Sequence, residues 1–591
     1  DQLEAARSSI KQQGVYGPVA VDMLHSTQLP YIDNLVNLLV IDRGSDIQQE
    51  EILRVLTPGG VAVTREGDGW KKQVKPRPDN IDDWTHFLHD ASGNSVAHDD
   101  VVGPPRHLQW LGSPRWSRHH DRMASMSALV SSGGRIFYIM DEGSRISIQL
   151  PAKWALIARD AFNGTVLWKR QIDHWQNHLF PLKSGPTQLA RRLVADGDRV
   201  FVTLGLQAPL LCLDAATGET IRTYPESKTT EEVIHTDGTL LAVVTRQPPQ
   251  LTDFTPKFNV GDQARVRNEI HWNAKPRVVM AINADSGKVL WEKETVVAPL
   301  SLATMSDRVL YHDGTRVVCL ARASGKELWN SDPAGRREAV TFNFGPRMLL
   351  YKDVVLFAGG DRKMSAYDLA SGKLLWSAPH AKSGYESPED LMVSGGLVWS
   401  APTTRTGDSG IFTGRDPRTG EVKSEFSPNV ETYWFHHRCY IAKATDKFLL
   451  TSRTGIEFVD PEAEDWDIHH WVRGGCLYGI MPSNGLVYAP PHDCACYPEA
   501  KLYGLNVLAP SSPNRALTDP PEGDKRLVRG PAFGAIKAIQ PGIGDWPTFR
   551  GDNSRSGFTE TAVDSPATSR WETELGGRLS SVAVANGLVY V

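Results

Sequence analysis

Histidine, cysteine and arginine side chains concentrate between positions 431 and 503 of this 591-residue chain. Three stretches carry them: TYWFHHRCY, DIHHWVRGGCLYG and PPHDCACYPEAKLYG. Imidazole and thiolate groups suit zinc or copper, and cysteines in an oxidising compartment form disulfides. The candidate metal ligands are His437, Cys476, His492, Cys494 and Cys496.

Three interpretations of this cluster stay open: a disulfide, for instance Cys476 with Cys494 or Cys496, a metal site, and simple burial. Successive side chains of a strand face opposite sides, so an adjacent histidine pair cannot direct both rings at one ion unless the strand is bulged. Cys-x-Cys is also a weaker zinc signature than paired Cys-x-x-Cys. The remaining cysteines, Cys212 and Cys319, occupy the same strand position in LLCLD and VVCLA, and we expect them in the core.

Arginines flank the histidines in similar settings, and Gly474-Gly475 allows close approach to the backbone. Loops that gather at one end of a β-structure are common ligand sites. We therefore predict a polar pocket for an anionic or sugar-like ligand and assign no catalytic residue. The expected lining residues are His436, His437, Arg438, His470, Arg473, His119 and His120.

The elements that must position this cluster follow a repeated pattern, small-Asp-x-x-(Thr/Ser/Asn)-Gly, often with Trp four residues after the glycine. A tight hairpin turn with a bulge requires a positive φ, which favours glycine there. The anchoring glycines are Gly164, Gly218, Gly287, Gly325, Gly372 and Gly420. The tryptophans are Trp168, Trp291, Trp329 and Trp376, and Arg222 and Ser424 take that place in the other two units.

The spacing of these glycines, 38 to 69 residues, fits four-stranded propeller blades with loops of variable length. One blade cannot bury both faces of its sheet, so neighbouring blades must stack, with the tryptophans as apolar plates between them. Two further segments, 445–460 and 483–509, have the strand pattern without the tryptophan. The predicted fold is mainly β, a propeller of eight blades with seven as the alternative.

Residues 1–70 alternate strand and helix patterns, which predicts a parallel α/β sheet of the Rossmann-like type. We expect a helix at 1–14, strands at 19–23 and 35–41, and a helix at 48–56. Residues 71–82 would link this segment to the propeller.

A long-range repeat marks the start of each predicted ring. Asp83-Trp84-Thr85-His86-Phe87 with Asp90 and Ser92 recurs as Asp545-Trp546-Pro547-Thr548-Phe549 with Asp552 and Ser554. Such an opening segment commonly supplies the strand that closes a ring and leaves no unpaired edge. We expect one propeller over 83–512, a Pro/Gly-rich linker or loop over 513–540, and the start of a second, truncated propeller over 541–591.

Composition excludes two classes of partner. The net charge is only -5 and 23% of residues are charged, so no basic field points to nucleic acid or to an acidic membrane surface. The longest apolar runs are far shorter than the roughly 20 residues that span a bilayer. The chain starts with neither Met nor an apolar signal core and stops inside a strand pattern, so both ends read as cut.

The glycine pattern and the D-W-P-x-F-R-x-D-x-x-R-S-G opening segment resemble the pyrroloquinoline-quinone (PQQ)-type propeller repeat of bacterial envelope proteins. That family includes quinone-dependent dehydrogenases and non-catalytic scaffolds. Its enzymes carry adjacent cysteines over the quinone and a calcium ion, and some carry Cys-x-x-Cys-His, but this sequence has neither cysteine motif. The resemblance implies an extracytoplasmic ligand-binding or scaffold module that binds a small molecule or an envelope protein. The alternative is an oxidoreductase that uses PQQ or a metal ion.

The string Leu29-Pro30-Tyr31 with Asp33-Asn34, followed by EILRVLTPGG at 51–60, resembles the second half of a class I S-adenosylmethionine-dependent methyltransferase. By that resemblance Asp22 would lie near the cofactor's adenine, but Asn37 stands where the family usually has an acidic residue. The family's Gly-rich first loop is missing. S-adenosylmethionine is therefore expected only if the other half is present in the intact protein, and methyl transfer is the third hypothesis.

Overall fold

The computed structural model is mainly β and forms two compact units, residues 1–515 and 516–591, which are described separately. The residues that the structure describes are 2–24, 26–42, 46–115, 125–146, 150–173, 175, 187–247, 274–337, 346–380, 390–400, 411–427, 440–451, 455–475, 478–492, 502–512, 527, 529–535, 537, 540 and 542–591. No helix among them is long and apolar enough to cross a bilayer.

The first unit begins with a helix and a small mixed sheet. Its elements are α1 (Gln2–Gln12), β1 (Val36–Ile41), α2 (Gln49–Val55), β2 (Leu56–Glu66) and β3 (Gly69–Val74). β1 and β2 are parallel and connected through α2, as the alternating pattern predicts, and β3 pairs antiparallel to β2 beyond the expected boundary at residue 70. The strand expected at 19–23 is wrong: Val19 makes only an isolated bridge to Tyr16, because no neighbouring strand pairs with this segment.

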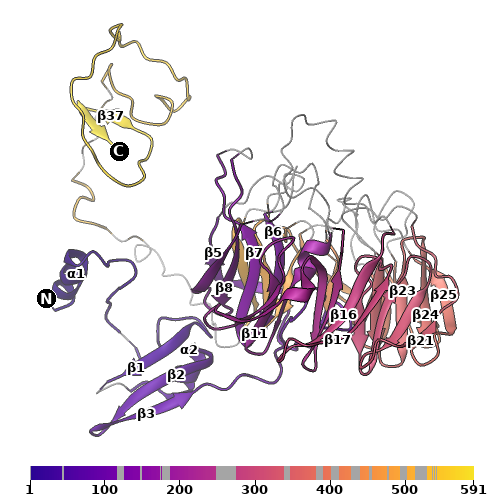
Figure 1. Ribbon diagram of the computed structural model, residues 1–591. Helices are drawn as coiled ribbons and strands as arrows, with labels where there is room; N and C mark the ends of the chain where they lie inside the picture. Colours follow the sequence, from indigo (N-terminus) through magenta and orange to yellow (C-terminus); the bar gives the residue numbers. More distant parts are fainter. Residues whose placement is uncertain are drawn as a thin grey trace. The chain divides into compact units, whose positions relative to one another are not determined.

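Eight further sheets of four or five strands follow in the described part of the first unit (Figure 1). The first two contain β6 (Met126–Ser132), β7 (Arg135–Asp141), β8 (Trp154–Asp160), β9 (Val166–Ile172) and β10 (Leu193–Asp196), β11 (Arg199–Thr203), β12 (Leu210–Asp214), β13 (Thr220–Tyr224). The next two contain β14 (Thr230–Thr236), β15 (Thr239–Val244), β16 (Arg277–Asn283), β17 (Val289–Thr295) and β18 (Ala303–Met305), β19 (Arg308–His312), β20 (Val317–Ala321), β21 (Glu327–Asn330). Short 3₁₀ helices, Thr187–Arg192 and Pro225–Ser227, precede β10 and β14.

The other four sheets repeat this up-and-down order. The fifth and sixth contain β22 (Arg347–Tyr351), β23 (Val354–Ala358), β24 (Lys363–Asp368), β25 (Leu374–Pro379) and β26 (Met392–Ser394), β27 (Leu397–Ser400), β28 (Phe412–Arg415), β29 (Val422–Phe426). The seventh contains β4 (Val96–Ala97), β30 (Lys443–Thr445), β31 (Leu449–Leu450), β32 (Ile456–Asp460) and β33 (Asp465–His469). The eighth contains β34 (Met481–Ser483), β35 (Leu486–Ala489), β36 (Leu505–Pro510) and β5 (Pro105–Gly112).

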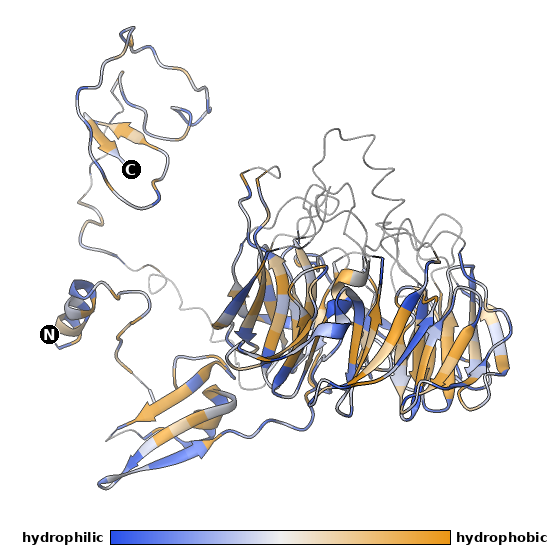
Figure 2. Cartoon of the chain, in the orientation of Figure 1, coloured by the Kyte–Doolittle hydropathy of each residue, from blue (hydrophilic) through white to orange (hydrophobic). Residues whose placement is uncertain are grey.

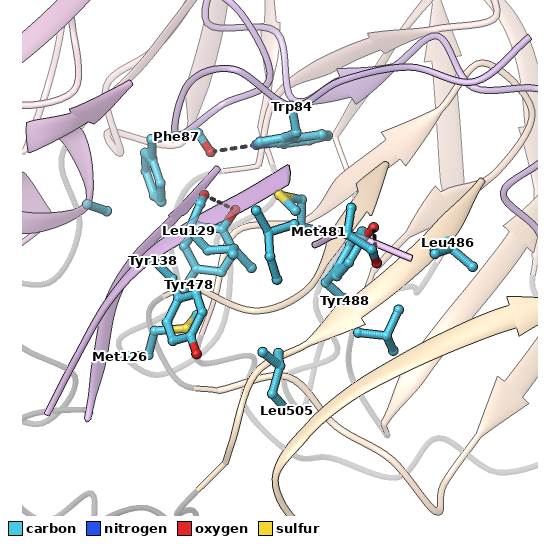
Figure 3. Packing of buried hydrophobic residues seen from close by; sticks show 14 of the residues in the cluster. Trp84, Phe87, Met126, Leu129, Tyr138, Tyr478, Met481, Leu486, Tyr488 and Leu505 are labelled. Atoms are coloured by element: carbon cyan, nitrogen blue, oxygen red, sulfur yellow. Dashed lines mark hydrogen bonds between the residues drawn. The ribbon is translucent and has the colours of Figure 1, made fainter. Parts of the chain in front are cut away.

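Buried apolar residues join each sheet to the next, and hydrophobic residues concentrate on the strands (Figure 2). One further cluster joins the last sheet to the first, with Tyr478 and Tyr488 packed against Leu129 and Tyr138 (Figure 3). The stacking therefore continues from the eighth sheet back to the first. This arrangement of stacked four-stranded sheets is a β-propeller.

The glycine pattern marks the contacts between neighbouring sheets. The six anchoring glycines all have φ between 67° and 76°, as the hairpin prediction requires. A Cβ added to Gly218 would lie 2.5 Å from the ring of Trp168 in the preceding sheet, and the Trp168 indole N–H donates to Ala215 O at 3.0 Å. Trp291, Trp329 and Trp376 meet Gly325, Gly372 and Gly420 in the same way. The tryptophans are therefore plates between sheets, as predicted.

The opening segment closes the stack. β5 pairs antiparallel with β36 and completes the eighth sheet, as expected of such a segment. Trp110 on β5 lies over Gly164 of the first sheet and donates its indole N–H to Ala161 O at 2.9 Å. The tryptophan–glycine contact that links neighbouring sheets is thus also present between the eighth sheet and the first.

The second unit has one hairpin, β37 (Ala583–Ala585) with β38 (Leu588–Tyr590), in the part that the structure describes. Trp546 forms an isolated bridge with Val584, and Trp84 forms one with Ser131 in the first unit. Thr548 bridges Gly551 as His86 bridges His89. The repeated opening segments therefore share a local conformation.

Candidate functional site: the hub and the channel of the propeller

Residues 82–97 form a hub that contacts the innermost strand of every sheet. The inner strands are β6, β10, β14, β18, β22, β26, β30 and β34. Moving along the hub, the backbone N–H groups that donate to it are those of Asn484, Ser131, Ala195, His235, Thr304, Leu350, Val393 and Ala444, at distances of 2.8–3.2 Å. The contacts start at the eighth sheet and then follow the sheets in order from the first to the seventh. One short segment thus satisfies a backbone donor from each sheet.

Two carboxylates tie the ends of the hub together. Asp99 accepts from the Asp82 N–H at 3.0 Å and from the Gly485 N–H at 2.8 Å. Asp82 accepts in turn from the His98 N–H at 2.7 Å. Burial raises the pKa of Asp99, whereas burial of Asp82 is outweighed by the His89 imidazole and the His98 N–H, so the pKa of Asp82 is lowered.

Apolar side chains of the hub pack between the last and first sheets. Trp84, Phe87 and Leu88 are buried in the cluster that joins the last and first sheets, and Figure 3 shows Trp84 and Phe87 beside Tyr478 and Met481. The Trp84 indole N–H donates to Phe87 O at 3.2 Å, so no polar atom of the ring is left without a partner. The hub is therefore tightly packed against the inner strands of the last and first sheets.

Three buried cations lie at or just before the N-terminal ends of inner strands. Two of them also contact the hub, because Arg347 Nη2 donates to Gly93 O at 3.4 Å and Lys443 Nζ lies 5.2 Å from the centre of the Trp84 ring. Arg347 and Lys443 are the first residues of β22 and β30, and Arg191 lies in the 3₁₀ helix Thr187–Arg192 that leads into β10. The exposed fractions of Arg347, Lys443 and Arg191 are 0%, 1% and 7%, respectively. Arg191 pairs with Glu232 at 2.8 Å, and Arg347 donates to Leu391 O at 3.1 Å. We call Arg191, Arg347 and Lys443 the cationic layer.

Arg347 is the least satisfied member of the cationic layer. Its Nε and Nη1 atoms are buried and have no hydrogen-bond partner among the described residues. Burial, together with the charge of Arg191, lowers the pKa of Arg347 to about 9, although Asp390 opposes this shift. A buried guanidinium with unused N–H groups costs free energy that an anion would recover.

Lys443 is held between carbonyl oxygens and aromatic rings. Its ammonium donates to Tyr478 O at 3.1 Å and to Ile480 O at 2.5 Å, and it lies 3.8 Å from the centre of the Tyr478 ring. Burial and the charge of Arg347 lower the pKa of Lys443 well below its usual value. An anion close to both groups would oppose this shift.

The predicted pocket in the His/Cys/Arg-rich region is only partly described. Arg473 is 1% exposed, whereas His470 is exposed, and His492 is buried and stacks on Tyr503 with ring centres 5.4 Å apart. Asp22 is exposed and pairs with Arg7 at 3.2 Å. The other predicted site residues lie outside the described residues: His119, His120, His436, His437, Arg438, Cys476, Cys494 and Cys496. The prediction that Cys212 and Cys319 are core residues is confirmed.

The family resemblance implies PQQ and a metal ion, and the described residues do not fit the metal. No three His, Cys, Asp or Glu side chains in this part of the chain gather closely enough to hold an ion. The adjacent cysteines of the quinone enzymes are missing from the sequence as well. We therefore derive no redox step for this site.

Sequence reasoning missed the cationic layer, although the sequence carries a signal for it. RRLVAD, PRMLLY and IAKATD each place a cation at the start of a short apolar inner strand. A charged residue in that position has to face the channel or another sheet, and both environments are buried. The repeated placement in three blades was the available clue.

Comparisons with known proteins agree with the repeat architecture. Residues 275–427 match the family PQQ_2, described as outer membrane protein assembly factor BamB. This part of the chain is therefore similar to PQQ-like propeller repeats. No curated protein matches the chain.

Three similar solved structures have low identity. A europium-containing methanol dehydrogenase has 10% identity and a TM-score of 0.46, covering 72% of this chain and 97% of its own. BamB from Moraxella catarrhalis has 11% identity and a TM-score of 0.39, covering 68% and 99%. The quinohemoprotein alcohol dehydrogenase from Comamonas testosteroni has 10% identity and a TM-score of 0.45, covering 75% and 83%.

Proposed function

We propose that this protein is a binding module that holds a small anionic ligand in the channel of its propeller, on the cationic layer. The observation that carries the proposal is Arg347, which is fully buried and keeps two guanidinium nitrogens, Nε and Nη1, without a partner among the described residues. Arg191 and Lys443 add positive charge, and a buried site of low polarity strengthens their attraction for an anion. The proposed chemistry is recognition of a carboxylate, sulfate or phosphate group.

The hub supports this function because it gives the channel a packed floor. We propose that the eight sheets are the eight blades of one closed ring over residues 83–512, since the hub contacts all eight inner strands in order. Trp84 and Phe87 are buried beside the cationic layer, where they would close a central channel on the hub side. A ligand would then enter from the end that lies opposite the hub.

The setting of the module is proposed from its likeness to the BamB family. That likeness favours an extracytoplasmic location, in the periplasm or cell envelope, where an envelope protein could be a partner in addition to a small molecule. We keep the proposed division into an α/β segment, a linker, a propeller, a second linker at 513–540 and the start of a second propeller. Methyl transfer with S-adenosylmethionine stays a prediction.

Isothermal titration calorimetry with citrate and with inorganic phosphate tests the anion site. We expect at least one of the two anions to bind, and we expect Arg347→Gln to weaken that binding at least tenfold. Arg192→Gln is the control because Arg192 is also a buried arginine, at 7% exposure, but lies beside Trp175 and donates to Leu206 O. Its affinity should stay within twofold of the wild type.

Two results would overturn the proposal. One is that neither anion binds the wild-type protein. The other is that Arg347→Gln and Arg192→Gln weaken binding equally, because the effect would then reflect general destabilisation. Lys443→Gln provides a second variant in case Arg347→Gln does not fold, and it should weaken binding in the same direction.

A further inference from the structure

A cavity of about 480 Å³ is lined by hub residues and lies at the C-terminal ends of four inner strands, whereas the cationic layer lies at N-terminal ends. Its wall combines hub residues with the turns that follow the inner strands of the second to fifth sheets. A cavity of this size accommodates a small organic molecule. The residues that matter for its chemistry are His89, Asp90, Asp196, His235 and Lys352.

Carboxylates fix the orientation of two imidazoles in this wall. His89 Nε2 lies 2.6 Å from Asp82 Oδ2, and His235 Nδ1 lies 2.8 Å from Asp196 Oδ2. A neutral imidazole bonded to a carboxylate donates its N–H there, so its second nitrogen is a hydrogen-bond acceptor. Those second nitrogens, His89 Nδ1 and His235 Nε2, have no hydrogen-bond partner among the described residues.

The side chains of His89 and Asp90 place two hydrogen-bond acceptors, Nδ1 and Oδ2, near each other. The His89 side chain is only 7% exposed, and its Nδ1 lies 3.8 Å from Asp90 Oδ2, which is too far for a hydrogen bond. The other oxygen of Asp90 accepts from the Ser92 N–H at 2.8 Å and from the Ser92 hydroxyl at 2.5 Å. An ammonium nitrogen about 2.8 Å from each of Nδ1 and Oδ2, to one side of the line that joins them, would donate to both acceptors at once.

The charge of the cavity favours a cation. Asp90 and Asp196 are about half exposed to it, whereas Asp237 is paired with Arg322 at 2.8 Å. Lys352 is a cation in the wall, and its ammonium lies 5.1 Å from the centre of the Tyr351 ring. The negative charges of Asp90 and Asp196, together with the two imidazole acceptors, therefore exceed the single positive charge of Lys352.

We propose that this cavity binds a small organic diamine, with one primary ammonium group placed between His89 Nδ1 and Asp90 Oδ2. The second ammonium would lie toward Asp196, whose carboxylate also lines the cavity. This site is separate from the anion site and does not depend on it.

A proton competes with this ligand. His89 is surrounded by Asp82, Asp90, His86, His98 and, beyond His98, Asp446, and Trp84 packs on its other side. Burial alone would lower the pKa of His89, but the hydrogen bond to Asp82 and the charges of Asp90, Asp82 and Asp446 raise it overall. Protonated His89 donates from Nδ1 and cannot accept the ammonium N–H. Affinity should therefore rise as the pH rises through this pKa.

Calorimetry with 1,4-diaminobutane tests the proposal, with 1,4-butanediol as the uncharged comparison ligand. We expect only the diamine to bind, with affinity that increases from pH 6 to pH 8, and Asp90→Asn should weaken binding at least tenfold. Asp307→Asn is the matched control, because Asp307 is 79% exposed, also follows an inner strand and does not line the cavity. N-acetyl-lysine amide, titrated in parallel, shows whether a protein lysine binds better than the free diamine.

The diamine site requires all of these calorimetric results together. Equal binding of diamine and diol, no binding of either ammonium compound, or equal losses in Asp90→Asn and Asp307→Asn would each overturn the diamine site. Asp196→Asn is the second variant and should also weaken the diamine. Citrate affinity measured on the same samples should stay unchanged in Asp90→Asn, which separates this site from the anion site.

Discussion

Gly218→Ala tests the contact by which one blade fixes the next. In the structure a Cβ at Gly218 lies 2.5 Å from the ring of Trp168, and the residue has φ +74°. Gly238 has nearly the same backbone angle, φ +70°, and nothing lies within 4 Å of its added Cβ. Gly238→Ala is therefore a matched control that changes the backbone preference without meeting a tryptophan.

The magnitudes separate the two variants. An L-residue in the left-handed region costs about 1–2 kcal/mol, and both variants carry this cost. Carbon atoms in contact prefer about 3.5–4.0 Å, so the Trp168 ring must move by about 1 Å in Gly218→Ala. Such overpacking costs about 1–3 kcal/mol, and loss of the indole hydrogen bond to Ala215 O adds about 1 kcal/mol. We expect Gly218→Ala to destabilise the protein by about 2 kcal/mol more than Gly238→Ala.

Urea unfolding followed by circular dichroism measures the difference between the two variants. A double-mutant cycle with Trp168→Ala isolates the contact, because without the indole the cost of Gly218→Ala should fall to that of Gly238→Ala. Equal destabilisation by the two glycine variants, or an unchanged cost of Gly218→Ala in the Trp168→Ala background, would refute the stacking argument.

Three further predictions concern the hub, the pH dependence of stability, and the closure between the eighth and first sheets. Asn94→Leu removes two hydrogen bonds to the buried Val393 backbone, at 2.9 and 3.0 Å, and should lower stability by about 2–4 kcal/mol in urea unfolding, whereas a change below 0.5 kcal/mol would contradict the role of the hub. Burial lowers the pKa of His312 to about 4, and its stability contribution is therefore complete above pH 6.5, is lost as the pH falls toward 4, and amounts to at most about 3 kcal/mol. His312→Gln should flatten the decrease between pH 7 and 5, and an unchanged slope would disprove this assignment. Trp110→Ala should expose the closure between the eighth and first sheets to hydrogen exchange, with faster exchange at the Gly164 and Thr165 amides than in Trp376→Ala.

The repeated local signals predicted most of the fold. Each anchoring glycine with its strand pattern specifies a hairpin within about 20 residues, and a tryptophan at a fixed offset specifies the plate that the next sheet covers. The helix and strand at Gln49–Val55 and Val36–Ile41 followed from similar local patterns. The strand expected at 19–23 failed because a local apolar pattern does not supply the partner strand that it needs.

The site was predicted less well because its contacts are made between distant residues. The hub binds inner strands up to 401 positions away, mostly through backbone groups that leave no mark in the sequence. Arg347 looks like an ordinary charged residue next to a proline until the fold buries it. The histidine and cysteine cluster attracted attention through composition, yet of its described members Arg473 and His492 are buried, whereas His470 is exposed.

Anomalous diffraction from crystals soaked in selenate shows whether an anion binds to the cationic layer. We expect a selenium peak within hydrogen-bonding distance of Arg347 Nε or Nη1. A map in which a carboxylate of the protein itself bonds both of these groups, with no selenium in the channel, would contradict it.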